Sequence, residues 1–349
     1  MVDEKVADLV FEGGGVKGIG LAGAFAALEQ RGFAPKGVAG ASAGAITAAL
    51  IAAGYSSDEL DEILLHIPFA KFKDKGWEDK VPLLGPAASL LFERGIYEGK
   101  YFERWMTELL EAKKVTKFGQ LVDEAAEEEK NRYRLRVIAS DVTHRRMLVL
   151  PNDADHLGID PDELDIAHAV RMSMSIPVFF EPVVHRNEAT GEEHLIVDGG
   201  MLSNFPVWLF DCEGRDPQWP TFGLKLVEPE PNKPIGHRLP GEDHEAKAGS
   251  LVDYFKSLAS TMMEAHDRLY VETATFARTI AIPTLGVRTT EFDIQPERVR
   301  ALYDSGHQAA SDFLDQWDFG AYIEEFRRGN EHSRRADLDA SKSSPSNTG

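Results

Sequence analysis

Cysteine is almost absent from this chain, because Cys212 is the single one among 349 residues. This excludes an internal disulfide and any metal site built from several cysteines. Long hydrophobic runs are absent too, and no segment approaches the roughly 18 consecutive apolar residues that span a bilayer. The first residues, MVDEKVADLVFEGGG, are acidic and lack the apolar stretch of a secretory signal. These absences predict a cytoplasmic protein.

Basic residues are scarce, with 38 Lys and Arg against 58 Asp and Glu, a formal net charge of −20. This charge repels phosphate backbones and disfavours nucleic-acid binding, and it also opposes strong attraction to an anionic membrane. Hydrophobic residues still make up 43% of the chain, which is enough for a sizeable core and excludes a largely disordered or fibrous protein.

The apolar runs alternate between strand and helix patterns. A strand over 6–11, a helix over 19–30, a strand over 37–40 and a helix over 45–53 follow one another. This order predicts a buried, mainly parallel sheet covered by helices. Further expected elements are a helix over 101–110, strands over 133–140 and 147–151, a helix over 166–175, strands over 195–198 and 222–227, and helices over 251–277 and 297–317.

A glycine-rich loop follows the first expected strand and contains Gly13, Gly14, Gly15, Lys17 and Gly18. It matches G-x-G-x-x-G, but a dinucleotide site also needs a carboxylate at the end of the second strand, and none is present there. A Walker-type phosphate loop needs Ser or Thr after its lysine, where this chain has glycine. Two interpretations remain, a tight turn and an oxyanion hole formed by converging backbone N–H groups.

A second motif, G-x-S-x-G, places Ser42 between Gly40 and Gly44 at another strand-to-helix junction. A nucleophile elbow needs a turn so sharp that the flanking residues must be very small, and positions 39–45 are Ala or Gly except for the serine. The alternative is a structural serine that caps the following helix.

A serine nucleophile needs a base that takes its proton. The late histidines His266 and His307 fall in expected helices, not on loops after a strand. Asp198 instead ends an apolar strand and precedes Gly199 and Gly200, at the place where an open α/β sheet presents site residues. The alternative for this carboxylate is an ordinary turn aspartate.

In this order, the three motifs resemble those of the patatin-like phospholipase family: a glycine-rich oxyanion loop, a G-x-S-x-G serine and an Asp-Gly-Gly aspartate. The resemblance extends over about residues 6–320 and includes VRMSMSIP at 170–177, Ser140-Asp141, Asn204-Phe205-Pro206 and residues 289–292. Lys17 stands where many members have arginine.

The resemblance implies a three-layer α/β/α fold with a mainly parallel central sheet and helical additions at the C-terminus. It also implies a serine lipid acyl hydrolase of the phospholipase A or lysophospholipase type that works through an acyl-enzyme. Ser42 would be the nucleophile, Asp198 the base, and Gly13, Gly14 and Gly15 the oxyanion hole. No metal or cofactor is expected, and no histidine is expected to be essential, with His144 the first candidate for an exception.

The implied partners are a phospholipid or other acyl-ester lipid and a membrane or micelle surface that the protein contacts transiently. Two alternatives remain open: a general carboxylesterase acting on soluble acyl esters, and a non-catalytic lipid-binding regulator with the same fold. The presence of both Ser42 and Asp198 argues against the second.

We expect one catalytic domain over residues 1–327 and a disordered tail over 328–349, which has almost no apolar residues. Residues 66–100 mix aromatics such as Phe69, Phe72 and Trp77 with lysines, and predict a mobile lid that meets the lipid interface. The alternative is that these aromatics fill the core beneath a long loop. Residues 228–249 predict a surface loop.

Overall fold

The structure is a computed structural model that describes residues 5–65, 67, 99–126, 129–177, 179–212, 215–228, 273–289 and 291–327. Nearly all of the expected lid, the expected loop after residue 228, most of the expected helix over 251–277 and the tail over 328–349 lie outside these residues. Those expectations therefore remain predictions.

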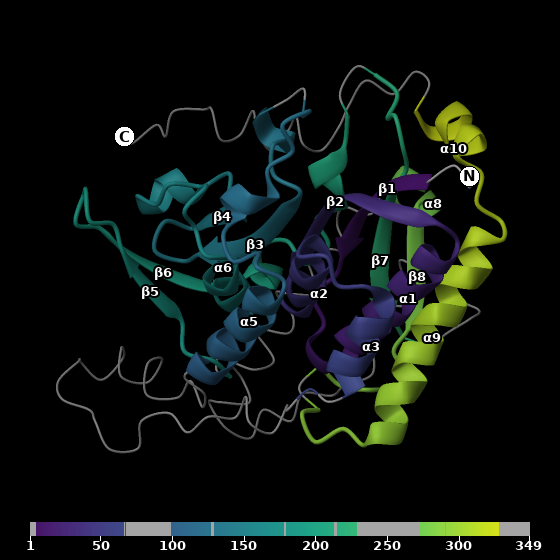
Figure 1. The fold of residues 1–349 in the computed structure, drawn as a ribbon, viewed down its shortest axis with the longest axis horizontal. Helices are drawn as coiled ribbons and strands as arrows, with labels where there is room; N and C mark the ends of the chain where they lie inside the picture. Colours follow the sequence, from purple (N-terminus) through teal and green to yellow (C-terminus); the bar gives the residue numbers. More distant parts are fainter. Residues whose placement is uncertain are drawn as a thin grey trace.

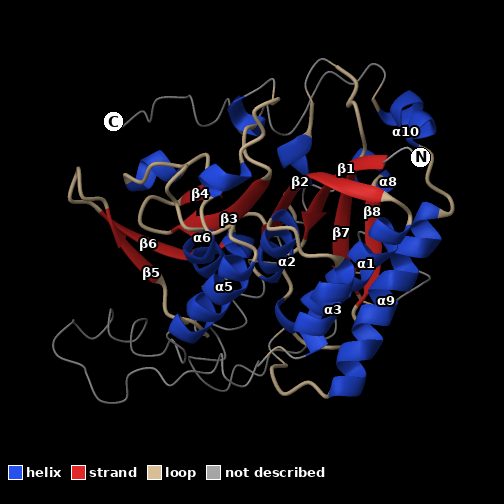
Figure 2. Ribbon diagram, in the orientation of Figure 1, coloured by secondary structure: helices blue, strands red, loops and turns tan. Residues whose placement is uncertain are grey.

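The described residues form an α/β fold around an eight-stranded, mostly parallel sheet with the order β5-β6-β3-β2-β1-β7-β8 and with β4 paired to β3 (Figures 1 and 2). The strands are β1 (Lys5–Phe11), β2 (Phe33–Ala41), β3 (Leu135–Asp141), β4 (Arg146–Leu150), β5 (Val183–Arg186), β6 (Glu193–Asp198), β7 (Thr221–Val227) and β8 (Thr279–Pro283). The helices are α1 (Ile19–Gln30), α2 (Ala43–Ala52), α3 (Ser57–Leu65), α5 (Lys100–Ala112), α6 (Ile166–Ser173), α8 (Thr273–Ala277), α9 (Pro296–Leu314) and α10 (Phe319–Phe326).

Parallel pairing joins β1 to β2 and β7, β2 to β3, and β7 to β8. The antiparallel part begins at β3, which pairs with β4 and with β6, and β6 pairs in turn with β5. As Figure 1 shows, α1, α3 and α9 cover the β7–β8 end of the sheet, whereas α5 and α6 lie near β3. Because β1, β2, β3, β7 and β8 run parallel, their carboxyl ends meet at one edge of the sheet, which is where sites form in open sheets.

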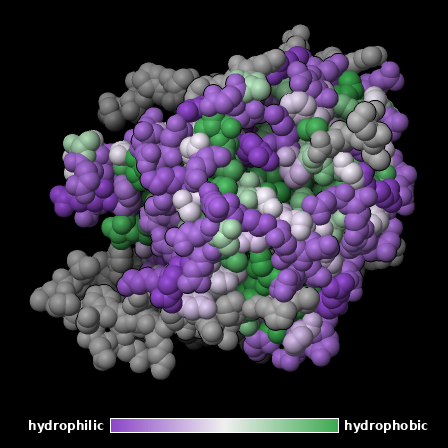
Figure 3. Space-filling view, in the orientation of Figure 1, coloured by the Kyte–Doolittle hydropathy of each residue, from purple (hydrophilic) through white to green (hydrophobic). Residues whose placement is uncertain are grey.

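Both faces of the sheet are apolar, and alternate residues of a strand serve opposite faces. Leu9 and Phe11 of β1 belong to the core beneath the helices, whereas Val10 belongs to a second core. The second core also contains Ile138 and Trp208. The surface in Figure 3 is mostly hydrophilic, with hydrophobic residues gathered near its middle.

The sequence patterns missed two strands at the borders of the sheet. β5 is a short, half-exposed edge strand with the sequence VVHR, in which apolar and polar residues do not alternate, so it shows no strand period. β8 forms the other edge and ends at Pro283, where the missing N–H of proline breaks no pairing. Pro35 lies inside β2 beside an irregularity in the β1–β2 register, which is where a sheet tolerates proline.

Candidate active site

Ser42 occupies the turn between β2 and α2 with backbone angles φ 51° and ψ −126°. A positive φ is strained for a residue with a side chain, and such strain concentrates at functional sites. Both neighbouring glycines are sterically required. A Cβ on Gly40 would lie 2.4 Å from the backbone of Gly44, and one on Gly44 would lie 2.2 Å from the carbonyl oxygen of Phe11. The G-x-S-x-G spacing therefore reflects the tightness of this turn.

Strand pairing brings Asp198 to the serine. Ala41, the last residue of β2, pairs with Ile138 of β3, and the neighbouring Ala139 pairs with Asp198, the last residue of β6. β3 therefore places the ends of β2 and β6 next to each other. The side chains of this serine and this aspartate are both buried, with exposed fractions of 1% and 0%.

The Asp198 carboxylate is held on one side and unsatisfied on the other. Its Oδ1 accepts a 2.7 Å hydrogen bond from the Gly200 N–H, whereas Oδ2 has no hydrogen-bond partner among the described residues. Burial raises the pKa of Asp198 to about 7, although the Ser42 hydroxyl and the Gly200 N–H counteract part of the rise. A carboxylate with this pKa can accept a proton far better at neutral pH than an exposed aspartate.

The end of α6 supports both residues, a role that the sequence analysis did not assign. The Ser173 hydroxyl accepts a 2.9 Å hydrogen bond from the Ser42 N–H. The Ser175 carbonyl accepts one of 3.0 Å from the Asp198 N–H. The VRMSMSIP segment was the signal for this contact, but only the fold shows which of its atoms are used.

The glycine-rich loop lies directly against the serine, because a Cβ on Gly13 would be 3.0 Å from the Ser42 Cβ. Asn204 clamps Gly13 twice: its carbonyl accepts the Gly13 N–H, and its side-chain amide donates to the Gly13 carbonyl, each at 3.1 Å. The N–H groups of Gly14 and Gly15, in contrast, have no hydrogen-bond partner in the described part of the chain. Among the described residues, two N–H donors of the loop beside Ser42 therefore remain for a ligand.

Other contacts set the shape of the loop. Gly15 has φ 55°, and a Cβ there would lie 2.1 Å from the carbonyl oxygen of Thr289, which also accepts the Val16 N–H at 3.0 Å. A Cβ on Gly18 would lie 2.9 Å from the Ala43 Cβ, so this end of the loop packs on the start of α2. Lys17, which resembles the family's basic position, is buried.

A buried ion pair joins β1 to β7 just before the loop. The Glu12 carboxylate accepts hydrogen bonds from the Lys225 ammonium at 2.5 Å and from the Leu226 N–H at 2.6 Å. Glu12 therefore fixes the end of β1 from which the glycines project.

No histidine among the described residues hydrogen-bonds with Ser42 or Asp198. His144, the first candidate for an exception, bonds to Asp141 instead, with its Nδ1 2.9 Å from the carboxylate oxygen Oδ2 that accepts the bond. A cavity of about 550 Å³ opens at the opposite end of β1, with Lys5, Trp219 and Trp317 in its lining. It therefore lies apart from the serine.

Comparison with known proteins decides the family. The profile of the family described as "Patatin-like phospholipase" matches residues 9–211. The chain belongs to the patatin-like phospholipase family. The matched residues include the glycine-rich loop, Ser42 and Asp198, and membership implies a lipid acyl hydrolase.

Two relatives of this patatin-like protein align over most of its length. "Uncharacterized protein YqhO" of Bacillus subtilis is 38% identical and covers 89% of this chain and 99% of its own. "Uncharacterized protein R571" of Acanthamoeba polyphaga mimivirus is 24% identical and covers 87% of this chain and 92% of its own. The crystal structure of VipD from Legionella pneumophila shares the fold, with a TM-score of 0.51 at 20% identity over 90% of this chain and 67% of VipD. Within the described ranges, we find no helix whose length and hydropathy suit a membrane crossing.

Proposed function

We propose that this patatin-like protein hydrolyses lipid acyl esters through a Ser42–Asp198 dyad. One observation carries the proposal: a strained, buried serine lies beside a buried carboxylate whose pKa is about 7. The two are brought together because the strands that end at them pair with neighbouring residues of β3. Such an arrangement supplies a nucleophile and a base without a histidine.

In the first step, the Ser42 oxygen attacks the ester carbonyl while Oδ2 of Asp198 takes the hydroxyl proton. The negative charge that develops on the substrate oxygen faces the N–H groups of Gly14 and Gly15, and one such donor typically contributes about 3 kcal/mol to transition-state stabilisation. The leaving alcohol takes the proton from Asp198 and departs, which leaves an acyl-enzyme. Asp198 then deprotonates a water molecule that releases the fatty acid and restores the serine.

The oxyanion role falls to Gly14 and Gly15 because the Gly13 N–H is already used by the Asn204 carbonyl. Gly13 instead lets the loop approach the serine, since a Cβ there would lie 2.2 Å from Oδ1 of Asn204. This division of roles refines the expectation that all three glycines donate.

The proposed substrates are phospholipids, cleaved as by phospholipase A or lysophospholipase, met at a membrane or micelle surface. Family membership supports a lipid substrate. The competing functions, a carboxylesterase for soluble esters and a non-catalytic lipid-binding protein, predict different behaviour in one set of assays.

The test compares the wild-type protein with Ser42→Ala and with the control Ser305→Ala, which removes a serine hydroxyl of α9 that bonds the Pro283 carbonyl. Each protein is assayed on phospholipid vesicles and on a short-chain p-nitrophenyl ester, and is then treated with a fluorophosphonate probe. Ser42→Ala should lose at least about 10³-fold in hydrolysis and all labelling, because the members of a catalytic unit fail together. The control should keep both.

Activity retained in Ser42→Ala would exclude the dyad. Hydrolysis of the soluble ester without hydrolysis of vesicles would favour the carboxylesterase. A wild-type protein that neither hydrolyses nor reacts with the probe would favour the non-catalytic lipid-binding function.

A further inference from the structure

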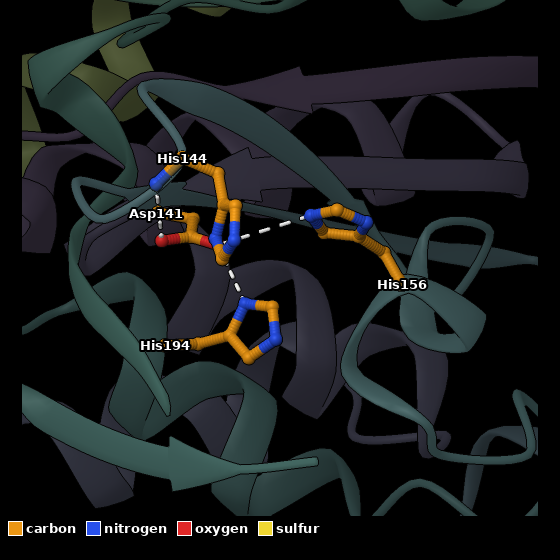
Figure 4. A group of neighbouring side chains, drawn as sticks. All are labelled: Asp141, His144, His156 and His194. Carbon is orange, nitrogen blue, oxygen red and sulfur yellow. Dashed lines mark hydrogen bonds and ion pairs between the residues drawn. The ribbon is translucent and has the colours of Figure 1, made fainter. Parts of the chain in front are cut away.

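Four potential metal ligands converge away from the dyad. Asp141, His144, His156 and His194 offer ligand atoms that all lie within 4.8 Å of one another (Figure 4). Asp141 ends β3, His144 lies in the β3–β4 turn, His156 lies in the short helix after β4, and His194 lies in β6. The fold, and no single sequence motif, assembles this group.

The Asp141 carboxylate lies at the centre. Its Oδ2 is 2.7 Å from Nδ1 of His194, 2.9 Å from Nδ1 of His144 and 3.9 Å from Nε2 of His156. The first two distances are hydrogen bonds, and the third is too long for one. Nε2 of His156 and Nε2 of His194 are buried and lack hydrogen-bond partners among the described residues. Hydrogen bonding alone therefore leaves the cluster incompletely satisfied.

We propose that Asp141, His144, His156 and His194 bind one divalent transition-metal ion of the zinc type. Three imidazoles and one carboxylate are a donor set that suits Zn²⁺ and its neighbours in the first transition row. In a tetrahedral site with bonds of about 2.1 Å the ligand atoms lie about 3.4 Å apart. The widest separation here, at most 4.8 Å, must therefore close by up to about 1.4 Å, and the pairs at 2.7 and 2.9 Å must open by about half an ångström, which rotations of the histidine side chains can supply.

The ion has a route from solvent, and binding requires each histidine proton to move to the other ring nitrogen. Asp141 and His194 are fully buried, but the side chains of His144 and His156 are 32% and 28% exposed, so an ion can enter from their side. Binding at Nδ1 of His144 and His194 moves each ring proton to Nε2. The His144 side chain is 32% exposed, so its Nε2–H can reach water, whereas the Nε2–H of His194 is buried without an acceptor among the described residues, which lowers the affinity. Binding at Nε2 of His156 moves its proton to Nδ1 and displaces the 3.3 Å contact with Arg146.

A site with four protein ligands is closed, as structural metal sites are. Asp141 lies two residues beyond Ala139, the partner of Asp198, and His194 lies four residues before Asp198 along β6. These separations are about 7 Å and about 13 Å in extended strands. The ion would therefore not contact the reacting ester. It would tie β6 to β3 and to the segment carrying His156, and so hold the strand that ends in the catalytic aspartate. The proposal stands independently of the hydrolase activity.

The experiment uses the tag-free full chain, stripped with a chelator and titrated with Zn²⁺ in competition with a chromophoric chelator. The variants are His144→Gln, His156→Gln and His194→Gln, with His307→Gln, which changes a histidine of α9 bonded to Gln30, as the matched control. Co²⁺ replaces Zn²⁺ in a second titration, because its visible absorption reports a four-coordinate site.

We expect one Zn²⁺ per chain and an intense visible Co²⁺ spectrum in the wild type and the control. The cluster variants should bind at least about 100-fold more weakly and lose that spectrum. Zn²⁺ at a hundredfold excess over its dissociation constant should raise the unfolding midpoint of the wild type by roughly 5 °C.

His144 lies in an exposed turn, so His144→Gln should keep the wild-type circular dichroism and unfolding midpoint in chelator. Equal affinities of wild type and His144→Gln, or no saturable binding by the wild type, would overturn the proposal and leave a hydrogen-bonded Asp–His cluster.

Discussion

Replacing Asp198 by asparagine should abolish hydrolysis and stabilise the folded protein at pH 8. The pKa of this buried carboxyl is raised from 3.8 to about 7, so the folded state holds the Asp198 proton between these pH values while the unfolded state releases it. Folding of the wild type therefore becomes less favourable as pH rises from about 4 to about 7. Asparagine keeps the shape and the acceptor for the Gly200 N–H but carries no charge.

The size of the effect follows from the pKa shift. At about 1.4 kcal/mol per pKa unit, ionising Asp198 costs the folded state about 4 kcal/mol once the pH exceeds 7. The stability advantage of Asp198→Asn should grow by about 1.4 kcal/mol per pH unit from pH 5 to pH 7 and then level off. Asp8, whose pKa burial raises to about 6, titrates in both proteins and cancels in the difference.

The assay is urea unfolding of both proteins at pH 5, 6, 7 and 8 and constant ionic strength, with free energies compared at each pH. Asp315→Asn is the control, since this aspartate is exposed and pairs with Arg31 at the surface. Its difference from wild type should not change across this range. If the free energy of unfolding of Asp198→Asn differed from that of the wild type by the same amount at every pH, the raised pKa would be refuted. The argument that Asp198 acts as a base near neutral pH would fail with it.

Three further outcomes are expected. The kcat/KM of the wild type should rise tenfold per pH unit up to about pH 7 and then level off, because only the ionised form of Asp198 can accept the serine proton. A flat profile from pH 5 to 8 would exclude Asp198 as the base. Gly15→Ala should lower hydrolysis at least about 100-fold, because its Cβ would lie 2.1 Å from a backbone oxygen and would displace the proposed oxyanion donor. The control Gly32→Ala, also at positive φ but with no atom within 4 Å of its Cβ, should keep hydrolysis near the wild-type rate. Glu12→Gln should lower the free energy of unfolding by about 3–5 kcal/mol because the buried Lys225 ammonium loses the negative charge of the Glu12 carboxylate. The double variant with Lys225→Met should recover part of that loss in urea unfolding.

Local chemistry explains how much the sequence determined by itself. The helix over 19–30 was predicted with the bounds that the structure shows, because a 3.6-residue apolar period and a following glycine are local signals. The small residues around Ser42 likewise indicated a tight elbow before any contact was known, since only glycine fits beside this turn at positions 40 and 44. Family and fold class followed from the order of such motifs, and the family match and the sheet topology confirm both.

Long-range packing decided the rest. That Asp198 meets Ser42 depends on their strands pairing with neighbouring residues of β3, and the pKa of about 7 depends on complete burial. The Gly13 N–H is taken by the carbonyl of Asn204, far along the chain, whereas those of Gly14 and Gly15 find no partner among the described residues. The cluster around Asp141 gathers ligands from the β3–β4 turn, the segment after β4 and β6, so no spacing in the sequence reveals it. Sequence patterns report local conformation and residue chemistry, whereas distances between strands, desolvation and hydrogen-bond competition exist only once the chain has folded.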